Sequence, residues 1–92
     1  LEMFLEAVPQ RLGELRLAAD TGDARTIGRI AHTLRSNAAE LGCDELAAAC
    51  RTVETQAADG RIGTPALDRL AAELEAAGTL LRIELAALTA DG

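Results

Sequence analysis

Apolar residues recur along the chain at intervals of three and four positions, which is the spacing of one face of an α-helix. Glycine and proline interrupt this pattern at Pro9, Gly22, Gly42 and the segment 59–65, and we take these interruptions as the ends of helices. The pattern predicts five helical segments: a short one ending before Pro9, then Pro9 to about residue 21, 24–41, 44–58, and a long last helix that follows residue 64.

Residues suited to helix ends lie at the predicted boundaries. Proline lacks a backbone N–H, which is tolerated in the first turn, so Pro9 can open the second segment. Asp23 is a good N-cap for the third, and Gly42 a good residue to end it. Thr64 and Pro65 fit the N-cap and first position of the last helix.

Each predicted helix has one apolar face. The inner positions that we expect, in chain order, are Leu1, Phe4, Leu5 and Val8; Leu12, Leu15 and Ala19; Ile27, Ile30, Ala31, Leu34, Ala38 and Leu41; Leu46, Ala49, Cys50, Val53 and Ala57; and Leu67, Leu70, Leu74, Ala77, Leu81, Leu85 and Leu88. Short connections favour antiparallel packing of sequential helices. We therefore predict an all-α fold, an up-down antiparallel four-helix bundle with a short additional N-terminal helix across one end.

The size and composition agree with one small helical domain. The 92 residues allow a single domain, residues 1–92, and the Ala-, Leu- and Arg-rich composition favours helix over strand. Aromatic residues make up 1% of the chain, which argues against a β-sandwich or barrel. Because the chain opens at Leu1, without Met and inside a predicted helix, we expect it to be a piece of a longer protein.

The formal net charge of −6 makes nucleic-acid binding an unsuitable main role, since phosphate backbones need cationic surfaces. No apolar run is long enough to span a membrane, and no signal-peptide pattern opens the chain. Cys43 and Cys50 lie seven positions apart, about 10 Å along one helix, beyond disulfide reach. One histidine and two cysteines make a poor zinc set, so we expect free thiols, no metal and a cytoplasmic location.

His32, the only histidine, faces water from the middle of the 24–41 helix, about 140° from the centre of its apolar stripe. Gly28 and Ser36, one turn to either side, and Ala39, two turns on, are all small, which leaves room for a partner to dock on the ring. The alternatives are an ordinary surface histidine and simple drift to small residues in an Ala-rich chain.

Three of the nine arginines surround this histidine. Arg25 lies seven positions before His32, Arg29 three positions before it, and Arg35 three positions after it. A guanidinium cluster of this kind would stabilise an anion held at the ring, as it does for phosphate. Solvated surface charges are the alternative, most plausible for Arg25.

The segment 31–42, AHTLRSNAAELG, closely resembles the signature of histidine-containing phosphotransfer (HPt) domains. His32 matches the phosphorylated residue, Leu34 the hydrophobic position, Arg35 the basic position and Gly42 the terminal glycine. Ser36 and Asn37 depart from the commoner glycine and serine but stay small. The resemblance extends to FLEAVPQRLGEL and LAAACRTVE and covers nearly the whole chain.

This resemblance implies a module of bacterial two-component phosphorelays. His32 would accept a phosphoryl group from the aspartate of a receiver domain and pass it to another receiver, and the partners would be receiver domains or a histidine kinase domain. Mg²⁺ and the catalytic residues would belong to the receiver, so the domain would need no cofactor and would be no enzyme by itself. The sequence agrees, because it holds no phosphate loop or nucleotide motif. We expect an isolated domain of this kind to be a monomer.

Glu54, on the next helix, is the candidate to orient the imidazole; chemotaxis-kinase relatives are similar in carrying a glutamate twenty-two positions after the histidine. A solvated Glu54 paired with Arg51 or another arginine is the alternative, and Gln56 is a weaker candidate. We expect partners to dock on the exposed sides of the second and third predicted helices, with Gly28, Ala39 and Leu17 or Ala18 as apolar contacts.

Two other functions remain open from the sequence. The domain could be the phosphoacceptor of a larger kinase of hybrid or chemotaxis type, or a helical interaction bundle that is never phosphorylated.

Overall fold

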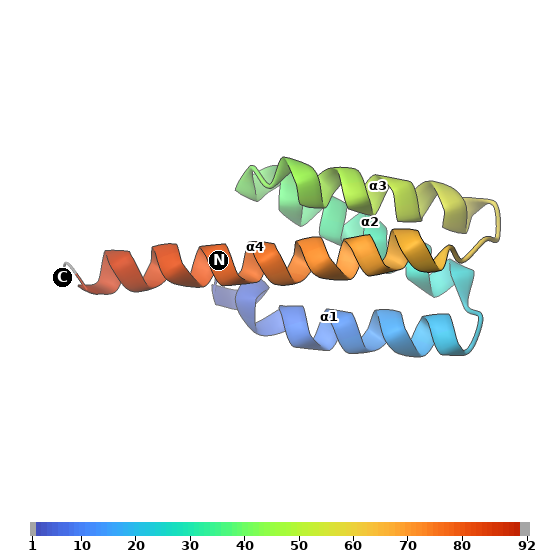
Figure 1. Ribbon diagram of the computed structural model, residues 1–92, viewed down its shortest axis with the longest axis horizontal. Helices are drawn as coiled ribbons and strands as arrows, with labels where there is room; N and C mark the ends of the chain where they lie inside the picture. The colour runs from blue at the N-terminus through green and yellow to red at the C-terminus, as the bar shows by residue number, and fades with distance from the viewer. Residues whose placement is uncertain (1, 91–92) are drawn as a thin grey trace.

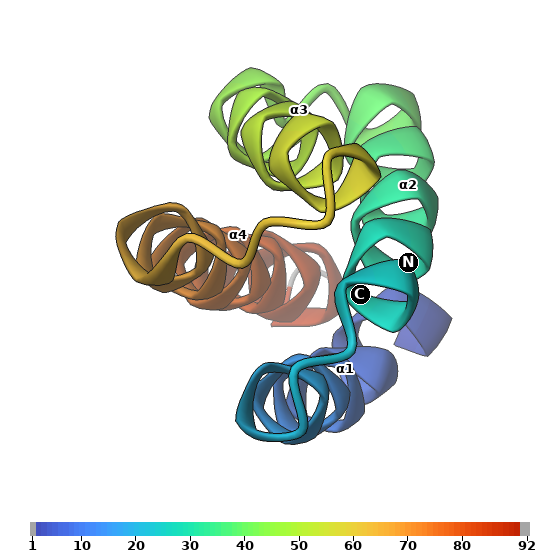
Figure 2. The same ribbon diagram turned by 90° about the vertical axis from the view of Figure 1, so that its right-hand side faces the viewer.

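The computed structural model describes residues 2–90, which form four α-helices: α1 Glu2–Asp20, α2 Ala24–Leu41, α3 Asp44–Ala58 and α4 Thr64–Ala90. Consecutive helices run in opposite directions, with their connections at alternating ends of the molecule (Figure 1). Seen end-on in Figure 2, the helices form a ring in chain order, in which α1 closes against α4. The prediction of an all-helical, up-down four-helix bundle is confirmed.

The predicted separate N-terminal helix is wrong, because α1 continues through Pro9. Proline removes one helical hydrogen bond and crowds the carbonyl one turn back, which kinks a helix rather than always ending it. The first part of α1 is inclined to the rest in Figure 1. Leu5 and Val8 before the proline and Leu15 after it are all buried, so packing on both sides holds the helix together. Leu1, which we expected on this face, lies outside the described residues.

The limits of α2 follow from its capping residues, as predicted. The carboxylate of Asp23 accepts hydrogen bonds from the backbone N–H of Thr26 at 3.1 Å and from its hydroxyl at 2.6 Å. Gly42 has φ 74°, a left-handed conformation that glycine adopts without strain. The N–H groups of Gly42 and Cys43 then satisfy the carbonyls of Ala39 and Ala38. These two caps fix the helix that holds His32.

The core is formed by the predicted apolar faces. The largest fully buried side chains are Ile27, Leu34, Leu46, Cys50, Leu70 and Leu74. Burying one Leu or Ile side chain contributes about 1.5–3 kcal/mol. The tightest packing in the ring joins α2 to α3. A Cβ added at Gly28 would lie 3.2 Å from the Cβ of Ala57, so the absence of a side chain there lets the two helices approach closely.

The last helix is longer than the bundle. In Figure 1, α4 runs past the ends of the other helices toward its C-terminus. Its inner stripe is buried as far as Leu81, but Leu85 is only partly covered and Leu88 is 71% exposed. The prediction that Leu88 belongs to the core is therefore wrong, since no other helix extends far enough to cover it. Ala18, which we considered for a docking surface, is also a core residue, whereas Leu17 is exposed.

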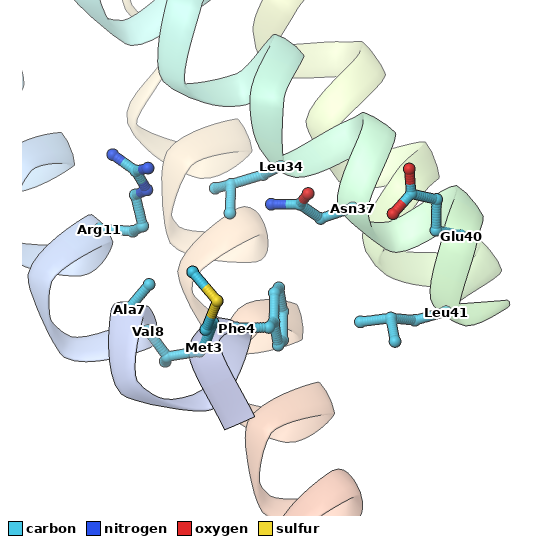
Figure 3. Close-up of a pocket in the computed structure, with 9 residues that line it drawn as sticks. All are labelled: Met3, Phe4, Ala7, Val8, Arg11, Leu34, Asn37, Glu40 and Leu41. Atoms are coloured by element: carbon cyan, nitrogen blue, oxygen red, sulfur yellow. The ribbon is translucent and has the colours of Figure 1, made fainter. Parts of the chain in front are cut away.

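A shallow pocket of ≈ 330 Å³ lies between the first part of α1 and the second half of α2. Figure 3 shows Phe4 and Met3 of α1 facing Leu34 and Leu41 of α2 across it. His32 does not line this pocket, and its side chain is largely exposed to solvent.

Candidate functional site

His32 lies in the middle of α2 on the face opposite its buried stripe, and its side chain is 61% exposed. The residues that flank it along this face leave the ring open. Ala39 is exposed, and the Ser36 hydroxyl donates back to the carbonyl of His32 at 3.3 Å instead of reaching the ring. Gly28 is half-buried against α3. An incoming group can therefore approach the imidazole from solvent.

Glu54 of α3 contacts the inner edge of this imidazole. The Nδ1 atom of His32 lies 2.8 Å from Oε1 of Glu54, between residues 22 positions apart in sequence. A carboxylate oxygen can only accept here, so Nδ1 must carry the proton. In the neutral ring the other nitrogen, Nε2, then holds the free lone pair. The arrangement sets one tautomer, in which the free lone pair lies on Nε2.

Arg35 completes a three-residue cluster with His32 and Glu54. Its Nε lies 2.8 Å from Oε2 of Glu54, and its Nη2 lies 3.4 Å from Oε1 of Glu54 and 3.3 Å from Nδ1 of His32. Since Nδ1 already donates to Glu54, the contact between Nη2 and Nδ1 is a close approach of two donors that share one acceptor. The Glu54 carboxylate thus bridges the guanidinium and the imidazole.

The pKa of Glu54 reflects these contacts. Partial burial raises it, but the hydrogen bond from His32 and the charge and hydrogen bond of Arg35 together outweigh burial and hold the pKa below its usual value. The group is therefore a carboxylate throughout the neutral range, which is the form that can accept the Nδ1 proton.

The other residues singled out from the sequence lie outside this cluster. Arg25 and Arg29 are exposed. Hydrogen bonds from Thr26 chiefly lower the pKa of Asp23, and the charges of Arg29 and Arg25 lower it further. Neither contacts His32 by a hydrogen bond in the described structure. Gln56 faces the loop before α4, where its side chain lies against Gly63. Of the two residues considered for orienting the ring, Glu54 is the one in contact.

An ion pair of Glu54 with an arginine was one of the two alternatives from the sequence, and the structure identifies Arg35 as the partner. Sequence reasoning missed the packing of Gly28 on Ala57, which brings the backbones of α2 and α3 together beside the cluster. A mid-helix glycine signals a close approach but does not name the residue approached.

The remaining reactive groups do not extend the site. Cys43 and Cys50 are free thiols, and burial, aided by the charge of Glu54, raises the pKa of Cys50 to about 11. No three His, Cys, Asp or Glu side chains gather as a metal site within the described part of the chain. Over residues 2–90, no helix is both long and apolar enough to cross a bilayer.

A four-helix bundle that presents a solvent-exposed, carboxylate-bonded histidine in mid-helix defines a class of protein suited to carrying a group on an imidazole. The sequence model of the Hpt domain family matches residues 1–90, and the chain belongs to this family. Hpt domains act in histidine phosphotransfer within phosphorelays, interact with receiver domains, and are phosphocarriers rather than catalysts by themselves. No curated protein and no solved structure matches the chain.

Proposed function

We propose that His32 is the phosphorylated residue, and that this domain accepts a phosphoryl group from the phosphoaspartate of one receiver domain and passes it to another. The observation that carries the proposal is the 2.8 Å contact between Nδ1 of His32 and Glu54, because it leaves Nε2 unprotonated and turned away from the supporting residue. An exposed nucleophile suits a donor that is itself part of a folded protein.

The transfer needs no proton movement at the attacking atom. The Nε2 lone pair forms a bond to phosphorus while the bond from phosphorus to the aspartyl oxygen breaks, and the aspartate leaves as a carboxylate. The ring then carries a positive charge shared with Nδ1–H, which faces the Glu54 carboxylate. A hydrogen bond to a charged group is worth about 1.5–3 kcal/mol, so Glu54 favours the charged ring over the neutral one. Return of the group to a second aspartate reverses these steps.

The supporting residues act on the phosphoryl group and on access to it. Arg35 uses Nε and Nη2 for its contacts with Glu54 and His32, so Nη1 is left to donate to a phosphoryl oxygen one helical turn away. Arg29, one turn before the histidine, makes no hydrogen bond to it in the described structure and adds positive charge to the surface that the donor approaches. Gly28, Ser36 and Ala39 keep the approach to Nε2 clear. Mg²⁺ is assigned to the receiver.

A phosphoacceptor domain of a larger histidine kinase would use the same local chemistry at His32. The full-length sequence distinguishes this arrangement from a free-standing carrier, because only the kinase would hold an ATP-binding domain in the same chain.

The test is phosphotransfer from phosphorylated receiver domains in the presence of Mg²⁺. Wild type should gain an acid-labile, base-stable phosphate, and His32→Gln should gain none while keeping its helical content. Equal labelling of His32→Gln would overturn the assignment of the site. A wild-type domain left unlabelled by every receiver of its organism would indicate an interaction bundle that is not phosphorylated.

A further inference from the structure

The surface around His32 has the opposite charge to the molecule as a whole. The chain has a formal net charge of −6, yet α2 carries three arginines and a single acidic residue, Glu40. By contrast, α4 carries two arginines and four acidic residues. Arg51 of α3, one turn before Glu54, adds a further positive charge beside the site. The histidine is therefore presented within a basic area on an acidic protein.

Three of these arginines, Arg25, Arg29 and Arg51, are exposed and have no carboxylate within 4.0 Å in the described part of the chain. None of the three contacts His32 or Glu54 there by a hydrogen bond or ion pair, whereas Arg35 contacts both residues. Arg25 precedes His32 by about 10 Å along the helix axis, close to the Debye length of about 8–10 Å at physiological salt. At such a distance a charge acts on an approaching molecule rather than on the ring.

The three side chains surround the His32–Glu54 pair. Since α2 and α3 run antiparallel, Arg25 lies toward one end of the bundle from this pair and Arg51 toward the other. Two shallow hollows share Glu54 in their lining; Arg25 borders one, and Arg35, Arg51 and the acidic Asp59 border the other. A partner seated over His32 would thus meet positive charge on both sides of the contact.

We propose that Arg25, Arg29 and Arg51 form a docking rim that steers receiver domains with an acidic surface around their phosphoaspartate onto His32. This inference rests on the proposed function and names the kind of receiver that the domain selects. A cluster of charges of one sign attracts a partner surface of the opposite sign and raises the association rate by about 10–10³-fold, and salt screens this effect. The acidic remainder of the surface repels the same partner from other faces, so the rim also orients the encounter.

The experiment compares three sets of substitutions in one receiver-to-His32 transfer assay, under conditions where the rate is second order. The rim variant is Arg25→Glu/Arg29→Glu/Arg51→Glu. Its control, Arg16→Glu/Arg69→Glu/Arg82→Glu, makes the same change in net charge on α1 and α4. The third variant is Arg25→Lys/Arg29→Lys/Arg51→Lys. It keeps the positive charge but replaces each guanidinium, which can donate two parallel hydrogen bonds, by an ammonium group. Circular dichroism and Tm verify that all remain folded.

We expect the rim reversal to slow transfer by about tenfold or more at low salt, and the difference to shrink toward 1 M salt, where the Debye length is about 3 Å. The control and the lysine variant should stay within about threefold of wild type, since long-range steering depends on local charge and not on fork geometry. A rim variant that equals the control, or a lysine variant as slow as the rim reversal, would overturn the docking rim while leaving phosphotransfer intact.

Phosphoramidate separates docking from chemistry. This small donor transfers its phosphoryl group to the imidazole with release of ammonia, and it needs no docking surface. At high salt it should label His32 equally fast in wild type and all three variants. Slower labelling of the rim reversal would place the arginines in the chemical step and contradict the inference. If no receiver labels the wild type, the proposed function fails, and the docking rim fails with it.

Discussion

The hydrogen bond between His32 and Glu54 makes the reactivity of an exposed side chain depend on a residue of the neighbouring helix. In water, a free imidazole exchanges its proton between both nitrogens, and only one of the two tautomers presents a lone pair at Nε2. The carboxylate selects this tautomer and fixes the ring plane, while Arg35 keeps the carboxylate ionised and in place. The proposed nucleophile, Nε2 of His32, thus has its tautomer set without any partner.

Replacing Glu54 separates orientation from charge. Glu54→Ala removes the acceptor and should slow transfer by about 10–100-fold, the equivalent of the 1.5–3 kcal/mol of one charged hydrogen bond. Glu54→Gln can still accept from Nδ1–H but lacks the charge, so its rate should fall between alanine and wild type. Imidazole ¹⁵N chemical shifts would report the tautomer, with Nε2 unprotonated in wild type and mixed in Glu54→Ala. Unchanged shifts in Glu54→Ala would remove Glu54 from the positioning role.

The lowered pKa of Glu54 also predicts a pH dependence of stability. A carboxyl group whose pKa is lower in the folded protein contributes stability above its unfolded pKa, near 4.5, and loses it as the pH falls through the folded value. The Tm of wild type should therefore exceed that of Glu54→Gln at pH 5, and the difference should narrow as the pH is lowered progressively below 4.5. A difference that stays constant over this range would show that the carboxylate charge adds nothing to folding.

Features of the site that lie within one helix could be predicted from the sequence, whereas contacts between residues far apart in the sequence could not. The exposure of His32 follows from the helical wheel of a single helix, and the basic residue beside it, Arg35, follows from the local motif. The role of Glu54 stayed open between orientation and an ordinary surface ion pair, because it depends on how α2 and α3 cross. The structure shows that Glu54 makes both contacts at once, to His32 and to Arg35. Side-chain conformations across two helices decide this, and no spacing rule encodes them.

Tertiary packing also decides what local signals mean for whole helices. Pro9 predicted a helix end, but Leu5 and Val8 on one side and Leu15 on the other anchor both parts of α1 in the core. From the sequence, we interpreted Gly28 as leaving open space for a docking partner, with random drift as the alternative. The structure shows in addition that Gly28 packs closely against Ala57 across the α2–α3 interface. The helix limits at Asp23 and Gly42 were predictable because caps are made within a few residues.

Two glycine-to-alanine substitutions test this close approach. Gly13 lies in α1 with nothing within 4 Å of an added Cβ, so Gly13→Ala should stabilise the protein by about 0.8–1 kcal/mol through helix propensity alone. Gly28→Ala gains the same propensity but places its Cβ 3.2 Å from that of Ala57, so the helices must shift and the gain should largely disappear. Chemical denaturation measures both. Equal stabilisation by the two substitutions would mean that α2 and α3 do not need the glycine.

Ala57→Gly offers a direct check of the same contact. The double variant Gly28→Ala/Ala57→Gly has a methyl group at position 28 of α2 and none at position 57 of α3, so the close contact between two Cβ atoms is absent. The interaction energy of the cycle should be favourable by about 0.5 kcal/mol or more, as for residues in contact. Additive effects would place the two positions out of contact.

At the scale of the whole molecule, the bundle is a closed ring of four helices from which one helix projects. The described chain measures 48 × 21 × 18 Å, and α4, at about 1.5 Å per residue, accounts for most of the long dimension. The 3–4 spacing of leucines in α4 continues past the last helix that can cover it. A periodic pattern identifies a face of a helix but not the length over which that face is buried, which is why Leu88 was misplaced.

Two leucines of the same helix and the same stripe should therefore contribute unequally to stability. Leu74 is fully buried, so Leu74→Ala should cost about 2–5 kcal/mol of unfolding free energy, whereas Leu88→Ala should change it by less than about 0.5 kcal/mol. Both substitutions lose the same atoms and keep helix propensity nearly constant, so each serves as the control of the other. Measuring the two variants by denaturation at several protein concentrations also tests the expected monomer. A large cost for Leu88→Ala that grows with concentration would show that a second copy covers the projecting end of α4.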